Sequence, residues 1–141
     1  MISVVQVIRT WLLTQPLIIP QVGARIWGMP GIPSGEVPSM PRKAMTVYQN
    51  PGTARWGVPL FNASIQFRCY GLTPWEAEEV WGALYDTLHR VNCINVTIGA
   101  DDYVIYVSQL GSGPSEQQEP LTGWPFQLAS FTFVAYESVL P

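Results

Sequence analysis

Residues 60–91 read LFNASIQFRCYGLTPWEAEEVWGALYDTLHRV, and this stretch decides the fold. From Leu60 to Tyr70, apolar and polar side chains alternate, which is the period of a strand with one buried face. The apolar set is Phe61, Ala63, Ile65, Phe67 and Cys69, and the polar set is Asn62, Ser64, Gln66, Arg68 and Tyr70. The pattern therefore predicts a long strand whose polar face meets water or another chain.

A helix is expected after the break at Gly71-Leu72, over about Thr73 to Val91. Thr73 and Glu76 form a Thr-x-x-Glu capping box, and the intervening Pro74 suits the first helical position. One side of the helix carries Ala77, Val80, Trp81, Leu84, Leu88 and Val91, and the other carries Glu79, Gly82, Asp86, His89 and Arg90. This phase places the helix on the apolar face of a sheet, with Trp75 pointing away from it.

The rest of the chain predicts a second helix, further strands and two irregular arms. The helix is expected over residues 3–14, and residues 15–22 read as an apolar connection punctuated by prolines. Strands are expected over residues 23–29, 43–49, 53–59, 92–100, 103–110 and 126–139, with turns at Asn50-Pro51-Gly52 and Asp101-Asp102. The arms are Pro30 to Pro41, which holds four prolines, and Gly111 to Pro125, which begins with a polar, breaker-rich run.

These elements predict the α+β class in one domain over residues 1–141. The expected architecture is an antiparallel or mixed sheet with two helices packed on one face and long irregular arms. A chain of this length can bury enough surface to fold without metal or disulfides.

The composition favours a subunit of an assembly over a hydrophobic monomer. Only 12% of the residues are charged, against a usual share of about 25%, and there are six tryptophans and thirteen prolines. The net charge is −3, and the seven Lys and Arg residues are scattered, which argues against a nucleic-acid reader. Gln6 and Arg9 interrupt the apolar N-terminal stretch and Pro16 and Pro20 break it, so we expect no membrane span.

No motif in the sequence predicts catalysis, a metal site or a cofactor. The single histidine, His89, lies on the polar helix face without a nucleophile at motif spacing, and Cys69 reads as a small buried hydrophobe. The carboxylate groups have structural explanations: Asp101-Asp102 in a turn, Glu76, Glu78 and Glu79 at a helix start, and Glu116 and Glu119 in a solvated loop. We therefore read the chain as a protein that is not an enzyme and carries no cofactor.

The tryptophans outside the predicted core leave two interpretations open. Trp27, Trp56, Trp75 and Trp124 lie in or beside loops or on a polar face, and tryptophan is enriched at interface hot spots. Together with Met40, Arg42 and Arg55 they form the candidate subunit interface. The alternative function is a small-molecule-binding module or enzyme, in which the four tryptophans would converge on one aromatic-lined pocket.

Several segments together carry a resemblance to a known family. They are the N-terminal helix, GARIW at 23–27 before a Pro-rich loop, MTVYQ at 45–49, SIQFRCY at 64–70, TPWEAE at 73–78 and FTFVAY at 131–136. In this order they resemble the tail terminator (tail completion) proteins of long-tailed bacteriophages. The long, proline-rich first arm departs from that pattern.

The resemblance implies a structural virion protein, located in the tail or neck and in the host cytoplasm during assembly. Its partners would be copies of itself in a hexameric ring, the tail tube protein and the head-tail connector protein. The ring would end tube polymerisation at the head-proximal end, and DNA would pass through it without sequence-specific binding. Within that role, we expect some of Asp101, Asp102, Glu116 and Glu119 to face the channel, where like charge keeps DNA from adhering.

Overall fold

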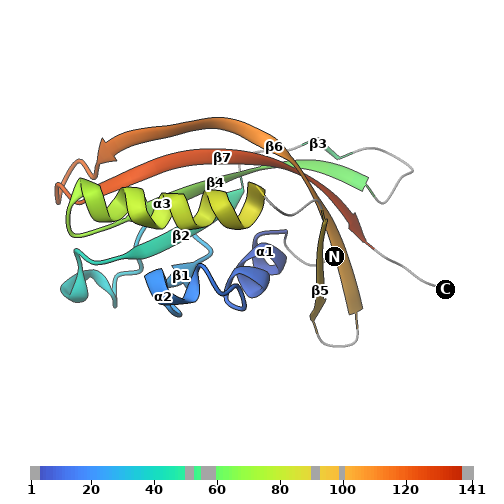
Figure 1. The fold of residues 1–141 in the computed structure, drawn as a ribbon, viewed down its shortest axis with the longest axis horizontal. Helices are drawn as coiled ribbons and strands as arrows, with labels where there is room; N and C mark the ends of the chain where they lie inside the picture. The colour runs from blue at the N-terminus through green and yellow to red at the C-terminus, as the bar shows by residue number, and fades with distance from the viewer. Residues whose placement is uncertain (1–3, 50–52, 55–59, 90–92, 99–100, 138–141) are drawn as a thin grey trace.

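The computed structural model describes residues 4–49, 53–54, 60–89, 93–98 and 101–137, which form one sheet with helices on one side (Figure 1). The helical elements are α1 (Val4–Leu12), α2 (Ile19–Val22), the 3-10 turn η1 (Val37–Ser39) and α3 (Pro74–His89). The strands are β1 (Ile26–Trp27), β2 (Ala44–Gln49), β3 (Thr53–Ala54), β4 (Leu60–Tyr70), β5 (Cys93–Ile98), β6 (Asp101–Gln118) and β7 (Pro125–Glu137).

The sheet of the described residues is mixed, with the strand order β1-β2-β4-β7-β6-β5 and with β3 beside β4. The short β1 runs parallel to β2, and every other pairing is antiparallel. β4 has the bounds expected from its alternation and pairs with β7 along its whole length, from Leu60 opposite Tyr136 to Tyr70 opposite Phe126. The predicted α+β class is therefore confirmed.

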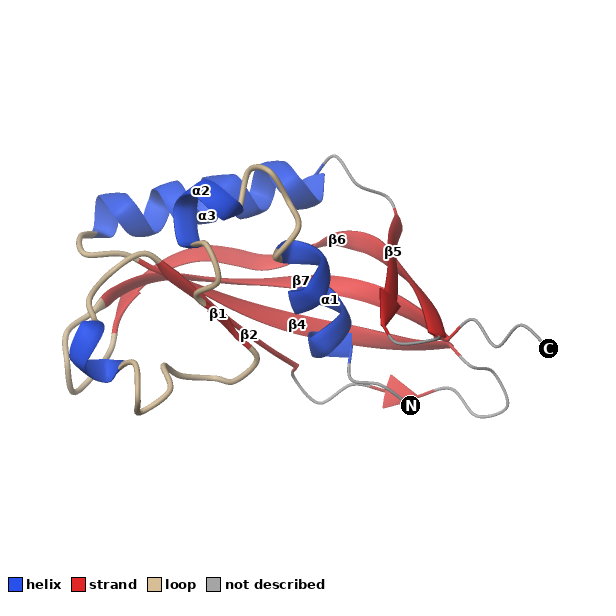
Figure 2. Ribbon diagram, turned by 90° about the horizontal axis from the view of Figure 1, so that it is seen from below, coloured by secondary structure: helices blue, strands red, loops and turns tan. Residues whose placement is uncertain are grey.

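The helices α1, α2 and α3 cover one face of this sheet (Figure 2). Their buried residues, which include Val7, Ile8, Val22, Leu84 and Leu88, share one core with apolar side chains of the strands. The strand members of that core are Ile26, Met45, Val47, Ile65, Phe67, Cys69, Ile94, Ile105, Phe131 and Phe133. The placement of the two predicted helices on one face is thus correct, and α2 is a third helix where we expected only a connection.

The link from β4 to α3 follows from local sequence. The Glu76 backbone N–H donates to Thr73 Oγ1 at 3.3 Å, which is the expected N-cap bond. A Cβ on Gly71 would lie 2.4 Å from Ala77 N, so only glycine allows so close an approach of the strand end to the helix. Trp75 is 74% exposed, as its helical phase predicted.

The prediction of an irregular arm from Gly111 to Pro125 is wrong over most of its length. β6 continues to Gln118, and Ser112 to Gln118 pair with β7 from Ser130 to Pro125. Three register shifts between Val107 and Ser115 accommodate the glycines and the proline, which is how bulges let a strand carry such residues. The irregular part is confined to residues 119–124, which we call the closing turn.

The turn expected at Asp101-Asp102 is also wrong. Both residues belong to the β5–β6 ladder, in which Asp101 pairs with Ile98 and Asp102 with Thr97. Pairing with β5 satisfies the backbone N–H and C=O groups of these residues within the sheet. The Asn50-Pro51-Gly52 turn and residues 55–59 of the predicted hairpin arm lie outside the described residues.

Candidate functional site

The face of the sheet opposite the helices is polar along most of its length. Strand register places these side chains on it: Ala44, Thr46 and Tyr48 of β2, Ser64, Gln66, Arg68 and Tyr70 of β4, and Phe126, Leu128, Ser130 and Thr132 of β7. None of the three α-helices of the described residues packs on this face. It is the polar strand face predicted to meet water or another chain.

One end of this polar face is covered by the first arm. The irregular arm contains the short helical turn η1, in which the Met40 N–H donates to Val37 O at 3.1 Å. Ile32 and Met40 of the arm, together with Trp27, Trp124 and Leu128, pack on a small buried cluster of Ala44, Tyr70 and Phe126. The apolar residues among the arm's prolines thus fold it back onto its own sheet.

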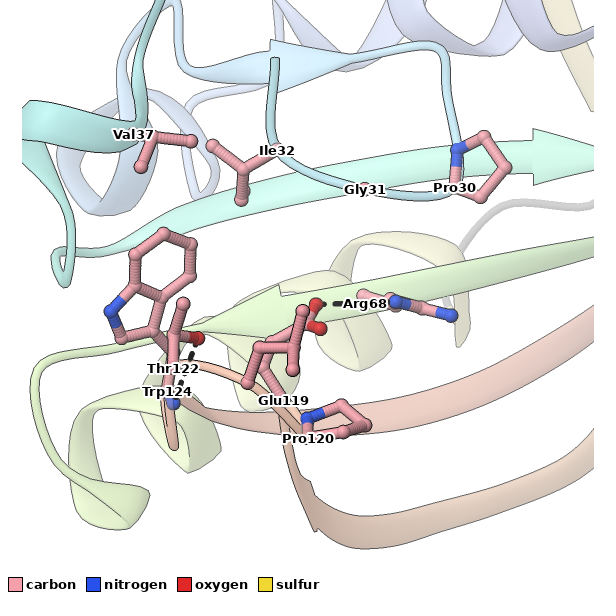
Figure 3. A pocket seen from close by; sticks show the side chains of 10 residues that line it. Pro30, Gly31, Ile32, Val37, Arg68, Glu119, Pro120, Thr122 and Trp124 are labelled. Carbon is pink, nitrogen blue, oxygen red and sulfur yellow. Dashed lines mark hydrogen bonds and ion pairs between the residues drawn. The ribbon is translucent and has the colours of Figure 1, made fainter. Parts of the chain in front are cut away.

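A pocket of about 530 Å³ opens between the first arm and the closing turn (Figure 3). Its lining comprises Pro30, Gly31, Ile32, Val37, Arg68, Glu119, Pro120, Leu121, Thr122 and Trp124. We call it the arm pocket. Its walls are largely apolar, and its two charged side chains are Arg68 and Glu119. This volume is within the range of known ligand pockets, about 300–1,000 Å³.

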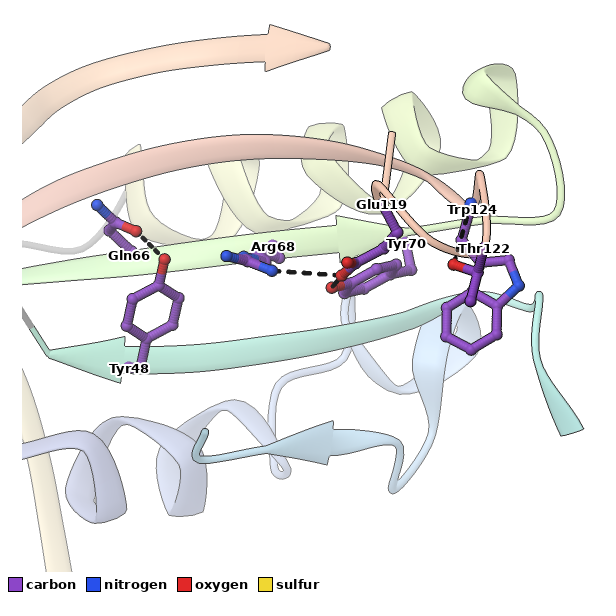
Figure 4. Close-up of polar contacts among 7 residues, drawn as sticks. All are labelled: Tyr48, Gln66, Arg68, Tyr70, Glu119, Thr122 and Trp124. Carbon is purple, nitrogen blue, oxygen red and sulfur yellow. Dashed lines mark hydrogen bonds and ion pairs between the residues drawn. The ribbon is translucent and has the colours of Figure 1, made fainter. Parts of the chain in front are cut away.

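Glu119 ties the closing turn to the sheet (Figure 4). Its Oε1 atom accepts a hydrogen bond from Tyr70 Oη at 2.5 Å and another from Arg68 Nη1 at 3.3 Å. The side chains of Arg68 and Glu119 are 25% and 21% exposed. None of the hydrogen bonds of the described residues ends on Glu119 Oε2, so this carboxylate has an acceptor to spare.

Aromatic rings hold the Arg68 guanidinium on both sides. Its Cζ atom lies 5.1 Å from the Phe126 ring centroid and 5.6 Å from that of Tyr48. Tyr48 in turn donates from Oη to Gln66 Oε1. Arg68 Nε is buried without a hydrogen-bond partner among the described residues, so cation–π contacts and Glu119 fix the side chain.

The Tyr70 phenol is neutral over the physiological pH range. Burial, and then the hydrogen bond to Glu119, raise its pKa above the ordinary value near 10. A folded-state pKa above the unfolded one contributes stability that is fully present below about pH 10 and is lost as the pH rises beyond it. The Tyr70 hydrogen bond between the sheet and the closing turn therefore weakens in alkali.

We expect the Arg68–Glu119 pair to show measurable coupling. Arg68→Met keeps the apolar stem but leaves Glu119 without its cation, and should lower the free energy of unfolding by about 1–2 kcal/mol. In a double-mutant cycle with Glu119→Gln, urea denaturation should give a coupling energy of about 0.5–2 kcal/mol. Arg42→Met, which removes the more exposed pair with Glu36 at 2.6 Å, is the matched control and should cost less. Additive single and double variants at Arg68 and Glu119 would contradict this account.

The structure brings three of the candidate interface residues together and leaves others apart. Trp27, Met40 and Trp124 pack on the same small cluster, and Trp124 also lines the arm pocket. Arg42 is held by Glu36, while Trp75 lies exposed on α3, on the other side of the sheet. Arg55 and Trp56 lie outside the described residues.

The acidic candidates are not gathered in one place. Asp101 and Asp102 begin β6 and Glu116 lies near its end, which puts about 45–50 Å of strand between them. Glu116 is exposed, but on a strand. Glu119 is half-buried and ion-paired, so its assignment to a solvated loop is wrong. The arm pocket residues Ile32, Val37, Arg68 and Leu121 were not predicted as site residues.

Other features bear on the chemistry available. Cys69 and Cys93 are free thiols, and burial raises the pKa of Cys69, which faces the core. His89 is exposed and stacks on Tyr85, with 5.1 Å between ring centroids. Across the described ranges, no group of three or more His, Cys, Asp or Glu side chains is placed to hold a metal ion. None of the helices in the described part of the chain has the length and hydrophobicity needed to span a bilayer.

The site thus consists of a polar sheet face that ends in a largely apolar pocket, with hydrogen-bonded Arg68, Glu119 and Tyr70 at its base. This arrangement suits recognition of an apolar group that carries a hydrogen-bond donor. Neither a scan against protein-family models nor a search of curated protein sequences finds a match to this chain.

Proposed function

We propose that this protein is a structural subunit of a bacteriophage tail. Copies of it form a closed ring at the head-proximal end of the tail tube, end tube polymerisation and join the tail to the head connector. The resemblance of its segments to tail terminator proteins supplies this role. The tail tube protein and the connector protein are its other partners, and DNA passes through the ring without sequence-specific recognition.

The observation that supports the proposal most is the exposure of large apolar side chains among the described residues. They are exposed to solvent on both sides of the sheet. Leu121 is 99% exposed, Trp75 is 74% exposed and Leu72 is 58% exposed. Tryptophan is enriched among the residues that dominate interfaces, and only 12% of the residues of this chain are charged, as is typical of surfaces that become buried. A heterologous contact joins two different surfaces of the same chain, one from each of two copies. Such contacts close into a ring when the rotation between copies allows it.

The second candidate is a small-molecule-binding module that uses the arm pocket. The volume of about 530 Å³ favours it. It predicts convergence of the four tryptophans, yet among the described residues Trp124 lines the pocket, Trp27 packs beside it and Trp75 lies on α3. An assembly contact accounts for the exposed Trp75, whereas a pocket in one chain does not.

The experiment is the removal of the gene from the phage that encodes it. We expect heads and tails that fail to join, and tails with abnormal lengths, because nothing ends the growing tube. Electron micrographs of the lysate measure both effects, and wild-type protein supplied in trans should restore joined particles with uniform tails. Tails of normal length attached to heads in the deletion strain would refute the proposed function.

A further inference from the structure

The arm pocket and Trp75 lie on opposite sides of the same sheet. Arg68, at the base of the pocket, projects from the face of β4 opposite the helices, whereas Trp75 lies on α3, which packs on the other face. Trp75 is 74% exposed and is not among the residues that line the pocket of its own chain. Copies placed side by side, helix layer against polar face, bring the two together.

We propose that Trp75 of one subunit inserts into the arm pocket of the next subunit. This inference rests on the proposed function, because it names the contact that builds the ring. The occupant is a second copy of this chain, and the group recognised is its indole. Each copy offers one indole and one pocket, so the contact is heterologous and repeats around the ring.

The chemistry of the pocket matches an indole more closely than it matches another apolar group. Ile32, Val37, Leu121 and Trp124 offer apolar walls on both sides of the opening, as Figure 3 shows for Ile32, Val37 and Trp124. An indole adds a single N–H donor and no acceptor, and a buried indole N–H needs a partner. Glu119 Oε2 supplies one, since Tyr70 and Arg68 both bind the other oxygen.

The same contact accounts for the largest exposed apolar groups. Leu121 lies at the pocket and Leu72 lies three residues before Trp75, so docking covers the three most exposed large apolar side chains of the described residues. A tryptophan side chain can bury about 150–250 Å², and tryptophan in a desolvated pocket is a typical hot spot. The base of the pocket is already neutral, because the charges of Arg68 and Glu119 compensate each other.

The first test compares ring assembly among variants by light scattering across a concentration series. Trp75→Ala should raise the protein concentration needed for assembly by at least about tenfold. Trp75→Phe, which keeps a ring but loses the N–H, should give a smaller increase of about threefold to tenfold. Tyr106→Ala, which removes another exposed aromatic, should leave assembly unchanged. Circular dichroism checks that each variant is folded.

The second test is a cross-link. In a Cys93→Ser background, with Cys69 buried, the pair Trp75→Cys and Leu121→Cys should form disulfides between chains and give a ladder of multimers on a non-reducing gel. Each single-cysteine variant should remain one chain or at most a dimer. A wild-type ring together with unchanged assembly of Trp75→Ala and no ladder would overturn this inference alone. A wild-type protein that never assembles would overturn the proposed function and this contact with it.

Discussion

Phe67→Ala should lower the free energy of unfolding by about 3–5 kcal/mol. Phe67 lies at the centre of β4, is fully buried, and has its ring centroid 5.7 Å from that of Phe131 and 6.4 Å from that of Phe133. The substitution removes the ring and leaves a cavity beneath α3 that rigid strands on both sides cannot close. Because domains are stable by only about 5–15 kcal/mol, this one change removes a large share of the total.

Urea denaturation followed by circular dichroism measures this effect. The matched control is Tyr106→Ala, an aromatic deletion at a side chain that is 49% exposed, which should cost less than about 1 kcal/mol. Both variants and the wild type must be compared in the same assembly state, since association adds to apparent stability. Equal losses for Phe67→Ala and Tyr106→Ala would show that the core is not centred on β4.

Gly113→Ala should lower the free energy of unfolding by about 2–5 kcal/mol, although Gly113 lies in a segment whose sequence is typical of a loop. Its φ is +92°, a conformation that L-residues avoid at a cost of about 1–2 kcal/mol. The new Cβ would also lie 2.6 Å from Leu128 O and 2.9 Å from Ala129 Cα of the paired strand. This overpacking adds about 1–3 kcal/mol, because backbone atoms cannot give way as a flexible side chain can.

Gly123→Ala separates the two contributions. Gly123 also has a positive φ, +72°, but a Cβ there meets no atom within 4 Å. Gly123→Ala should therefore lower the free energy of unfolding only by the cost of the positive φ, about 1–2 kcal/mol. Thermal or urea denaturation of both variants gives the difference. If Gly113→Ala is no worse than Gly123→Ala, the close pairing of β6 with β7 at this point is wrong.

The elements predicted best from the sequence are those whose signals come from residues close together in the chain. The alternation from Leu60 to Tyr70 predicted β4 with correct bounds, and the capping box and periodicity predicted α3 to within two residues at its C-terminus. The exposure of Trp75 followed from the helical phase alone. In each case the residues that carry the signal are close in the chain, so no knowledge of distant partners was needed.

Neither the full length of β6 nor the arm pocket could be predicted from local sequence signals. Residues 111–118 have the composition of a loop. They form a strand because β7 is long enough to pair with them. Strand formation commonly depends on such tertiary contacts more than on local propensity. Arg68 and Glu119 are 51 positions apart and meet only because β4, β7 and the closing turn bring them together. The one sequence signal for the pocket was the run of prolines and apolar residues in the first arm.

The proposed function requires that copies of this chain form a closed ring. Light scattering of the purified protein over a wide concentration range tests it most directly. We predict a defined species of six 15.7 kDa chains, about 94 kDa, that does not grow further as the concentration rises. A mass of 15.7 kDa at every concentration would contradict the account.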